Sequence, residues 1–364
     1  MRRFRPTFVE IDLEAVRENV RRLKPPDAAL MAVVKADGYG HGDAAVARAA
    51  LEAGASWLGV ALVEEGIGLR EAGIGAPILV LSELPRGSEE EALRSDLTPT
   101  LYTEAGLAAL TRAAAGRRVD VHVKLDTGMH RVGLWPPEAA PEFCRRVFEA
   151  GLGLGGLWTH FASAESDDAT TRGQLARFLS AVEAVRGAGI APGILHAANS
   201  AATLRFPQAH LDLVRPGIAL YGLAAGPGLD RGLTPAMTLR SQVTLVKRLP
   251  AGERLSYGHR YELERDAWVA TVPVGYEDGY PRLLSGRADV LIRGRRRRVA
   301  GTVTMDQLLA DCGDEEIAEG DEVVLIGSQG DERITADELA GLIGTIGYEI
   351  VTAVSERVPR EYRG

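Results

Sequence analysis

Ala32-Val-Val-Lys35-Ala-Asp-Gly-Tyr39-Gly-His-Gly42 joins an apolar run to a single lysine and then to three alternating glycines. The β-branched residues predict a buried strand, and the glycines allow the backbone to turn tightly after it. We therefore expect Lys35 to emerge at the C-terminal end of a buried strand, at the mouth of a site.

Lysine is rare in this chain, which makes Lys35 informative. The sequence has 42 lysines and arginines together, and only Lys24, Lys35, Lys124 and Lys247 are lysines. Arginine supplies positive charge equally well, so a retained lysine is a candidate for chemistry that needs a neutral, nucleophilic amine. We interpret Lys35 as such a catalytic lysine.

Composition excludes several classes of protein. The chain has 364 residues, 46% of them hydrophobic and 25% charged, and should fold as about two domains or as a barrel with an appendage. Its net charge of −8 argues against a nucleic-acid partner, and we find neither a membrane-spanning run nor a signal peptide. Cys144 and Cys312 lack metal-ligand spacing, so we expect a cytoplasmic protein without a metal site.

Up to about residue 230, short apolar runs alternate with alanine-rich helical stretches. The strand-like runs are 29–35, 57–61, 77–81, 98–102, 119–125, 155–161, 194–198 and 213–217, and the helical stretches include 13–23, 43–53, 64–72, 104–115, 138–150 and 171–188. Eight strands alternating with helices predict an α/β fold, a (β/α)8 TIM-type barrel, with a doubly wound open sheet as the alternative. The early glycines do not form a dinucleotide-binding fingerprint.

The pattern changes after the glycine-rich segment 226–232. Short β-like runs follow at 237–248, 267–274, 288–292, 297–304, 307–311 and 322–326, and a helix is expected from Thr335. We therefore predict a barrel domain over residues 1–234 and a mainly-β domain over residues 235–364, with residues 1–12 as a candidate strand of the second domain. The basic run 293–298 predicts a solvated hairpin.

Polar residues follow several predicted barrel strands, where barrel enzymes place their functional groups. They are Lys35, Lys124, His160, His196, Asn199, Ser200 and Arg215, and Gly217 and Ile218 follow Arg215 in the same loop. The loops after the last two strands offer a hydroxyl and backbone N–H groups that suit a phosphate. A lysine that can condense with an aldehyde, beside a phosphate cradle, suggests pyridoxal phosphate. Arg215 would donate to an unprotonated pyridine nitrogen, which favours a reaction with only a short-lived carbanion.

These and further motifs resemble the alanine racemase family of barrel-type (fold-type III) pyridoxal-phosphate isomerases. The resemblance runs through nearly the whole chain. Its motifs are Val33-Val-Lys-Ala-Asp-Gly-Tyr-Gly-His-Gly42, Lys124-Leu-Asp-Thr-Gly-Met-His-Arg-Val-Gly133, Thr159-His-Phe-Ala162, His196-Ala-Ala-Asn-Ser200, Arg215-Pro-Gly217, Ser256-Tyr-Gly258, Val274-Gly-Tyr-Glu-Asp-Gly279, Met305-Asp-Gln307 and Ile346-Gly-Tyr-Glu-Ile350.

The resemblance implies both the reaction and the assembly. It implies interconversion of L- and D-alanine by a two-base mechanism, with Lys35 and Tyr257 as the bases, which supplies D-alanine for bacterial cell-wall peptidoglycan. It also implies a homodimer in which each active site takes Tyr257 and Met305 from the other subunit. A cationic network around Arg215 would favour removal of the phenolic proton of Tyr257.

The resemblance assigns further positions one by one. Tyr39 and Tyr348, like Ser200, Gly217 and Ile218, match phosphate-binding positions. Arg131 matches the residue near the cofactor's phenolic oxygen and the substrate carboxylate, and Lys124 matches a lysine that carries a carbamate and orients Arg131. His160 and His196 match a network behind Tyr257 and Arg215.

The sequence departs from the family pattern at four positions. Thr302 and Thr304 stand where the family often has arginine and cysteine, Glu165 where it often has aspartate, and Gly347 where it often has asparagine. We expect Thr302 and Glu165 to line the substrate entryway, away from the chemistry.

Three other functions compete with alanine racemisation. A broad-specificity amino-acid racemase of the same fold is the nearest. A decarboxylase would usually place a carboxylate against the pyridine nitrogen, which Arg215 argues against. A non-catalytic cofactor-binding barrel would lack a second domain, which residues 235–364 argue against.

Overall fold

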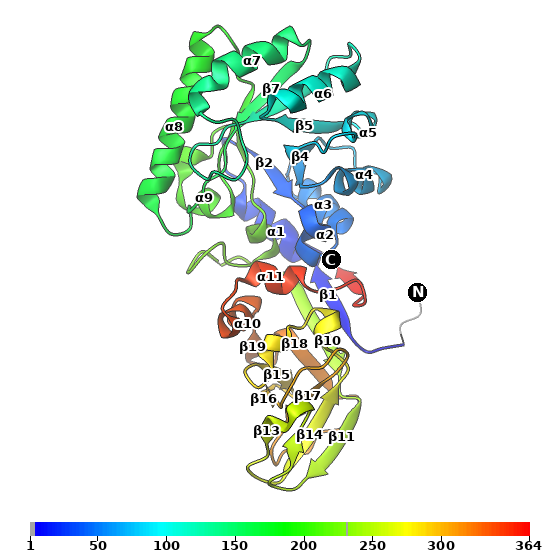
Figure 1. The fold of residues 1–364 in the computed structure, drawn as a ribbon. Coiled ribbons are helices and arrows are strands. Elements are labelled where there is room, and N and C mark those ends of the chain that lie inside the picture. The colour runs from blue at the N-terminus through cyan, green and yellow to red at the C-terminus, as the bar shows by residue number, and fades with distance from the viewer. Residues whose placement is uncertain (1–3, 231) are drawn as a thin grey trace. The chain divides into compact units, whose positions relative to one another are not determined.

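A computed structural model describes residues 4–230 and 232–364 of the chain, which form two compact units (Figure 1). The barrel unit comprises Ala15–Gly38 and Asp43–Thr234. The β unit comprises the N-terminal residues up to Glu14, together with Tyr39–Gly42 and Pro235–Gly364. A short piece of chain after Lys35 thus belongs with the C-terminal part of the protein.

Eight parallel strands form the barrel unit, in the spatial order β8, β7, β6, β5, β4, β3, β2 and β9. They are β2 Ala29–Val33, β3 Trp57–Val60, β4 Ile78–Glu83, β5 Leu97–Leu101, β6 Asp120–Lys124, β7 Gly153–Trp158, β8 Ile194–His196 and β9 Leu213–Val214. The N–H of Asp212 donates to Leu195 O and that of Arg215 to Ala198 O, which joins β9 to β8. The sheet therefore closes on itself, which confirms the predicted barrel over an open sheet.

Helices lie around the parallel strands (Figure 1). They are α1 Leu13–Leu23, α3 Asp43–Glu52, α4 Val63–Glu71, α5 Glu89–Arg94, α6 Glu104–Ala114, α7 Ala140–Glu149, α8 Asp168–Gly187 and α9 Ser200–Arg205. Met31, Leu79 and Leu213 form a buried apolar cluster against which Trp57 and Ile194 pack. Trp57, Leu79, Ile194 and Leu213 lie in the first two positions of their strands, and Met31 is the central residue of β2. Within the described ranges, no helix has the length and hydropathy to cross a bilayer.

The chain after β2 differs from the expected strand. β2 ends at Val33, and Lys35 is the first residue of the short helix α2, Lys35–Gly40. Four consecutive residues have φ between 52° and 58°, namely Ala36, Asp37, Gly38 and Tyr39. The helix is therefore left-handed. A residue with a Cβ atom costs about 1–2 kcal/mol in this conformation, so the surroundings must hold the turn in place.

The β unit is built on one ten-stranded sheet. Its strands are β1 Phe8–Asp12, β10 Met237–Gln242, β11 Leu245–Leu249, β14 Ala267–Val272, β15 Asp289–Ile292, β16 Arg295–Val299, β17 Leu308–Asp311, β18 Glu322–Gln329, β19 Glu332–Ile334 and β20 Arg360–Arg363. The first strand pairs antiparallel with β10 and parallel with β20. A separate pair joins β12 Arg254–Leu255 to β13 Tyr261–Glu262.

Local details of the β unit follow from its pairing. The single run expected at 237–248 is two strands, because β10 pairs with β1 and β18 whereas β11 pairs with β14. The basic run 293–298 does form a hairpin, in which β15 and β16 flank a turn with positive φ at Arg293 and Gly294. Thr335 caps the expected helix α10 Ala336–Ile343, and a second helix, α11 Gly347–Thr352, follows.

Candidate active site

Lys35 lies among charged groups at the start of α2. Burial and the charge of Arg131 lower the pKa of Lys35, and the charge of Glu65 opposes them. The carboxylate of Glu65 accepts a hydrogen bond from the N–H of Ala36 at 2.7 Å, and from two N–H groups of the β3–α4 loop at 2.8 and 3.0 Å. Glu65 therefore holds the first residue of the left-handed turn. The lowered pKa increases the fraction of Lys35 that is the neutral, nucleophilic amine.

Lys124 is the last residue of β6, where the sequence places it. Its Nζ lies 4.3 Å from the centre of the Trp158 ring. Burial, followed by the charges of Arg131 and Arg215, lowers the pKa of Lys124 to about 7. The cation–π contact favours the ammonium, but burial and the two arginines outweigh it. At neutral pH, Lys124 is therefore divided between ammonium and neutral amine.

Arg131 follows a tight turn after β6. The buried carboxylate of Asp126 accepts three consecutive backbone N–H groups, those of residues 128–130, at 2.9–3.1 Å. This turn brings the exposed Arg131 close enough for its charge to lower the pKa of both Lys35 and Lys124. Three of the predicted site residues are thus close together in the barrel unit.

Arg215 directly follows β9 and is 4% exposed. One of its Nη atoms donates to His196 Nδ1 at 3.1 Å, and the other to the carbonyl oxygens of Thr159 and Ala197 at 2.8 and 3.2 Å. Its guanidinium carbon lies 4.8 Å from the centre of the Trp158 ring. Burial lowers the pKa of Arg215 to about 9, so the guanidinium stays charged at neutral pH. The three acceptors fix its orientation.

The two predicted histidines lie on neighbouring strands of the barrel unit. His196 is the last residue of β8, and His160 lies two residues beyond β7. The imidazole of His196 stacks on Trp158, with 5.6 Å between ring centres and 8° between planes. Burial and the charge of Arg215 hold the pKa of both histidines well below the usual range. Both imidazoles are therefore neutral at pH 7.

Ser200 joins the loops that follow β8 and β9. Its Oγ accepts hydrogen bonds from the N–H groups of Gly217, at 2.8 Å, and Ala219, at 3.4 Å. With its oxygen engaged in this way, Ser200 keeps its own O–H as a donor. Ile218 begins the short 3₁₀ helix Ile218–Tyr221, and Asn199 uses its side chain to cap α9. The loop residues predicted to hold phosphate thus form one connected group of donors.

Two further predicted phosphate-binding residues meet in the β unit. Tyr39 in α2 and Tyr348 in α11 have ring centres 6.2 Å apart. A Cβ atom at Gly40 would overlap the carbonyl oxygen of Val351, so only glycine allows α2 to pack this closely on α11.

Tyr257 and Met305 are exposed on the β unit, at 74% and 49%. The hydroxyl of Ser256 donates to Thr302 O at 2.7 Å, and the hydroxyl of Thr302 donates to Tyr257 O at 2.9 Å. Thr302 is 4% exposed. The residue that we expected in the entryway therefore anchors the backbone of Tyr257. Glu165, by contrast, lies in the barrel unit, where its side chain packs against Gly226.

Three residues of the site escaped the sequence analysis. They are Glu65, Trp158 and His122, whose Nδ1 lies 2.8 Å from His196 Nε2. His122 carried a usable signal, because it precedes Lys124 by two residues in a strand and so shares its face. Trp158 directly precedes the motif at 159–162. The sequence around Glu65 contains no signal for its role, because its hydrogen-bond partner Ala36 lies 29 residues earlier.

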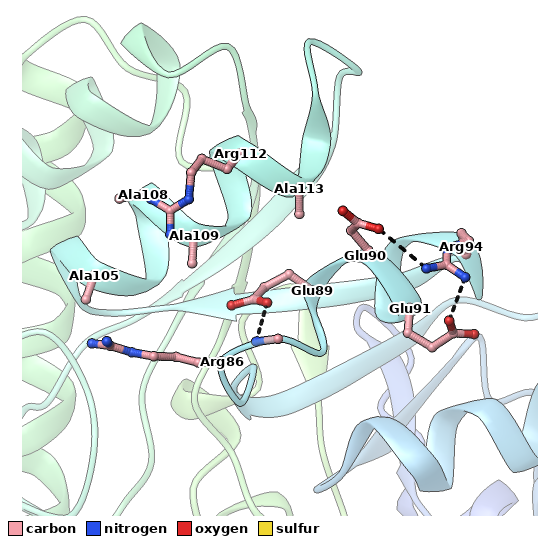
Figure 2. A pocket seen from close by; sticks show the side chains of 11 residues that line it. Arg86, Glu89, Glu90, Glu91, Arg94, Ala105, Ala108, Ala109, Arg112 and Ala113 are labelled. Carbon is pink, nitrogen blue, oxygen red and sulfur yellow. Dashed lines mark hydrogen bonds and ion pairs between the residues drawn. The ribbon is translucent and has the colours of Figure 1, made fainter.

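The groove between α5 and α6 is not a catalytic candidate (Figure 2). It is lined by alanines of α6 and by exposed charged side chains such as Arg86 and Arg112. Arg94 pairs with Glu91 at 2.9 Å within one helix. Such solvated pairs contribute little, and the lining contains no lysine, histidine or cysteine.

The strand ends of the barrel unit gather more basic than acidic side chains, and their net charge is positive whenever a lysine is protonated. The cations are Lys35, Lys124, Arg131 and Arg215, and the nearby acids are Glu65 and Asp126. Partly buried cations in excess require an anion. Pyridoxal phosphate fits this arrangement: the Ser200 loops suit its phosphate, an amine of lowered pKa suits its aldehyde, and the guanidinium of Arg215 suits its ring nitrogen. Fold and site together define a barrel-type pyridoxal-phosphate enzyme.

Comparisons with known proteins identify the family. Residues 11–225 match the alanine racemase N-terminal domain, and residues 236–362 match its C-terminal domain. The chain is 51% identical to the alanine racemase of Symbiobacterium thermophilum, over 99% of this chain and 98% of that protein. It is 47% identical to that of Frankia casuarinae, over 97% and 95%.

Solved structures agree with these sequence matches. The alanine racemase of Streptomyces lavendulae superposes with a TM-score of 0.94 at 42% identity, over all of this chain and 98% of that one. The Bacillus anthracis alanine racemase with bound L-Ala-P also has a TM-score of 0.94, at 38% identity, over 100% and 96%. The chain belongs to the alanine racemase family, a family of pyridoxal-phosphate-dependent isomerases. This confirms the predicted family, fold and cofactor.

Proposed function

We propose that the chain interconverts L- and D-alanine with two bases, Lys35 on one face of the amino acid and Tyr257 on the other. The observation that carries this proposal is the lowered pKa of Lys35, caused by burial and by Arg131. When bound, pyridoxal phosphate makes the α-proton of the amino acid acidic. On the D face, Nζ of Lys35 would remove the proton as an amine or supply one as an ammonium. On the L face, the oxygen of Tyr257 would remove the proton as a phenolate or supply one as a phenol, so that one residue gains a proton as the other loses one.

Other residues bind and orient. The guanidinium of Arg131 binds the substrate carboxylate, and its charge adds to burial in lowering the pKa of Lys35. The Ser200 hydroxyl, the N–H group of Ile218, and Tyr39 and Tyr348 bind the phosphate, and Gly217 holds Ser200 in place through its own N–H. Arg215, whose guanidinium is oriented by three acceptors, would donate a hydrogen bond to the ring nitrogen without transferring a proton, so the cofactor would be a weak electron sink.

We also propose a homodimer in which the β unit of one subunit completes the site of the other. The exposed large apolar side chains of the β unit include Tyr257, Tyr276, Leu283 and Met305. Backbone hydrogen bonds link Tyr276 to Thr304 and Glu277 to Met305, so Tyr276 and Met305 belong to one surface. An exposed group of this kind is typical of a protein interface.

Mixed dimers test the shared site. Lys35→Ala and Tyr257→Phe subunits, each inactive alone, should regain activity when refolded together, because one of the two sites in a mixed dimer is intact. Refolding each variant with itself is the control. If mixed dimers form, as shown by a tag on one subunit, and remain inactive, the sites are not shared.

Lys124 is proposed to carry a carbamate. A carbamate forms on a neutral amine, which a pKa of about 7 provides, and its negative charge would lie beside Arg131 and orient it. With ¹³C-labelled bicarbonate, a protein-bound carbamate signal should appear, grow as pH rises through 7, and vanish in Lys124→Met. A pH-independent signal that persists in Lys124→Met would exclude this site.

We also propose that the protein is located in the cytoplasm. Cys144 and Cys312 are free, buried thiols, which suits the reducing cytoplasm.

Borohydride reduction should attach the cofactor to the peptide that contains Lys35. In heavy water, Tyr257→Phe should stop racemisation but leave α-proton exchange of D-alanine measurable. If Tyr257→Phe exchanged the α-proton of both enantiomers equally, Tyr257 would not be the L-face base.

A further inference from the structure

The hydrogen bonds behind Arg215 continue through two buried imidazoles. Arg215 donates to His196 Nδ1 at 3.1 Å, and His196 Nε2 lies 2.8 Å from His122 Nδ1. A guanidinium has only donors, so His196 Nδ1 must accept, and the proton of His196 must sit on Nε2. That N–H then donates to His122 Nδ1, whose own proton must sit on its Nε2. The arginine therefore sets the direction of the whole chain.

Strand β7 makes room for the His122 ring. Gly156 is the register partner of His122, and a Cβ atom there would lie 2.7 Å from His122 Nδ1 and 2.6 Å from Ile194 O. A Cβ atom at Gly155 would lie 3.3 Å from His122 Cδ2. Glycine within a strand marks such a close approach. Trp57 packs against the imidazole with 5.4 Å between ring centres, so the ring is enclosed by specific neighbours.

His122 also reaches the opposite end of the barrel. It is only 1% exposed, yet it lines a cavity of about 570 Å³ at the amino-terminal ends of β3 to β8. The charged side chains of this cavity are Asp96, Arg117, Arg118 and Asp120. Because Nδ1 of His122 is engaged by His196, Nε2 is the ring nitrogen left for the cavity side.

We propose that His122 is a positioning residue that fixes the tautomer of His196 and, through it, the guanidinium of Arg215. This rests on the proposed function only in assigning Arg215 to the ring nitrogen of the cofactor. A second proton on His122 would set its Nδ1–H against the Nε2–H of His196, and the contact would become repulsive. Burial and the charge of Arg215 lower the pKa of His122 to about 4, so His122 is neutral at pH 7.

Nitrogen NMR of the protein labelled with ¹⁵N-histidine reads these tautomers directly. In the holoenzyme at pH 7, both His122 and His196 should be neutral with the proton on Nε2. In His122→Phe, which removes the acceptor, the shifts of His196 should move, and kcat should fall about 3- to 10-fold, as for one lost buried hydrogen bond. His122→Asn places an amide oxygen near the position of Nδ1 and should recover much of kcat.

Controls separate this role from packing and from the proposed function. Arg118→Gln alters the same cavity outside the chain of hydrogen bonds and should leave the His196 shifts and kcat unchanged. A wild-type His196 that is charged, or that is protonated on Nδ1, overturns the proposal even if His122→Phe does not fold. Unchanged His196 shifts in a folded His122→Phe also overturn it. Because the tautomers do not depend on turnover, they would stand even if the protein failed to racemise alanine.

Discussion

The left-handed turn after Lys35 predicts an unusual response to glycine. In a right-handed helix, replacing alanine by glycine costs about 0.5–1 kcal/mol, because glycine loses more conformational freedom on folding. Ala36 has a φ of 53°, and its Cβ atom costs about 1–2 kcal/mol in that conformation. Ala36→Gly removes this cost and adds the entropic one, so the barrel unit should become about 0.5–1 kcal/mol more stable.

Two matched variants complete the test. Ala108→Gly lies at an exposed position of the right-handed helix α6 and should destabilise by about 0.5–1 kcal/mol. Gly38→Ala should destabilise by about 1–2 kcal/mol, because Gly38 has a φ of 58° and a new Cβ atom would lie 3.2 Å from the backbone of Asp43.

Calorimetric unfolding is the assay for these three variants. For a unit of about 200 residues, 1 kcal/mol corresponds to about 2–4 °C in Tm. Ala36→Gly should therefore raise the Tm of the barrel unit by a few degrees, while the other two variants lower it. If Ala36→Gly lowers the Tm as much as Ala108→Gly does, the turn is not left-handed and the argument fails.

Three further outcomes follow from contacts in the site. Ser200→Ala removes the O–H that we expect to donate to the phosphate, a charge-assisted hydrogen bond worth about 1.5–3 kcal/mol, so the affinity for pyridoxal phosphate should fall at least about 10-fold in a fluorescence titration. An unchanged affinity would show that Ser200 does not bind the phosphate. Glu65→Gln removes a negative charge that raises the pKa of Lys35, so the pH midpoint for covalent capture of pyridoxal phosphate by the apoprotein should move down. A midpoint that moves up would show that the charge of Glu65 does not raise this pKa. Thr302→Val keeps the shape of the side chain but loses the hydrogen bond to Tyr257 O, so kcat should fall about 2- to 10-fold, whereas Thr302→Ser should keep the hydrogen bond and the wild-type kcat. Equal rates for both variants would show that the hydroxyl does not position Tyr257.

The fold was largely predictable because its periodicity is local. Apolar runs followed by alanine-rich helices locate all eight barrel strands to within a few residues. The ends of elements were harder, because they depend on distant partners. The strand expected at 213–217 ends at Val214, and Pro216 lacks an N–H for a ladder. Lys35 lies in a left-handed turn that Glu65 anchors from another helix, and no local pattern predicts that contact.

Candidate site residues could be predicted where the residue type itself indicates a chemical role. Residues that act only through a neighbouring side chain could not be predicted in this way. A scarce lysine at a strand end can be recognised from the sequence. The support of Arg215 by His196 was predicted only through the family resemblance. The contact of His122 with His196 was not predicted, because these residues lie on β6 and β8 and meet only when the barrel closes.

The scarcity of lysine acquires a physical meaning in this site. Burial lowers the pKa of Lys35, Lys124 and Arg215, but the consequences differ. Arg215, at about 9, stays charged at neutral pH, whereas Lys124, at about 7, is only partly charged. Arg131 and Arg215 therefore act as permanent charges that push protons off the lysines beside them. A lysine in place of the buried Arg215 would itself tend to lose its proton and would cease to lower the pKa of its neighbours. The site thus needs both residue types, arginine to stay charged and lysine to become neutral.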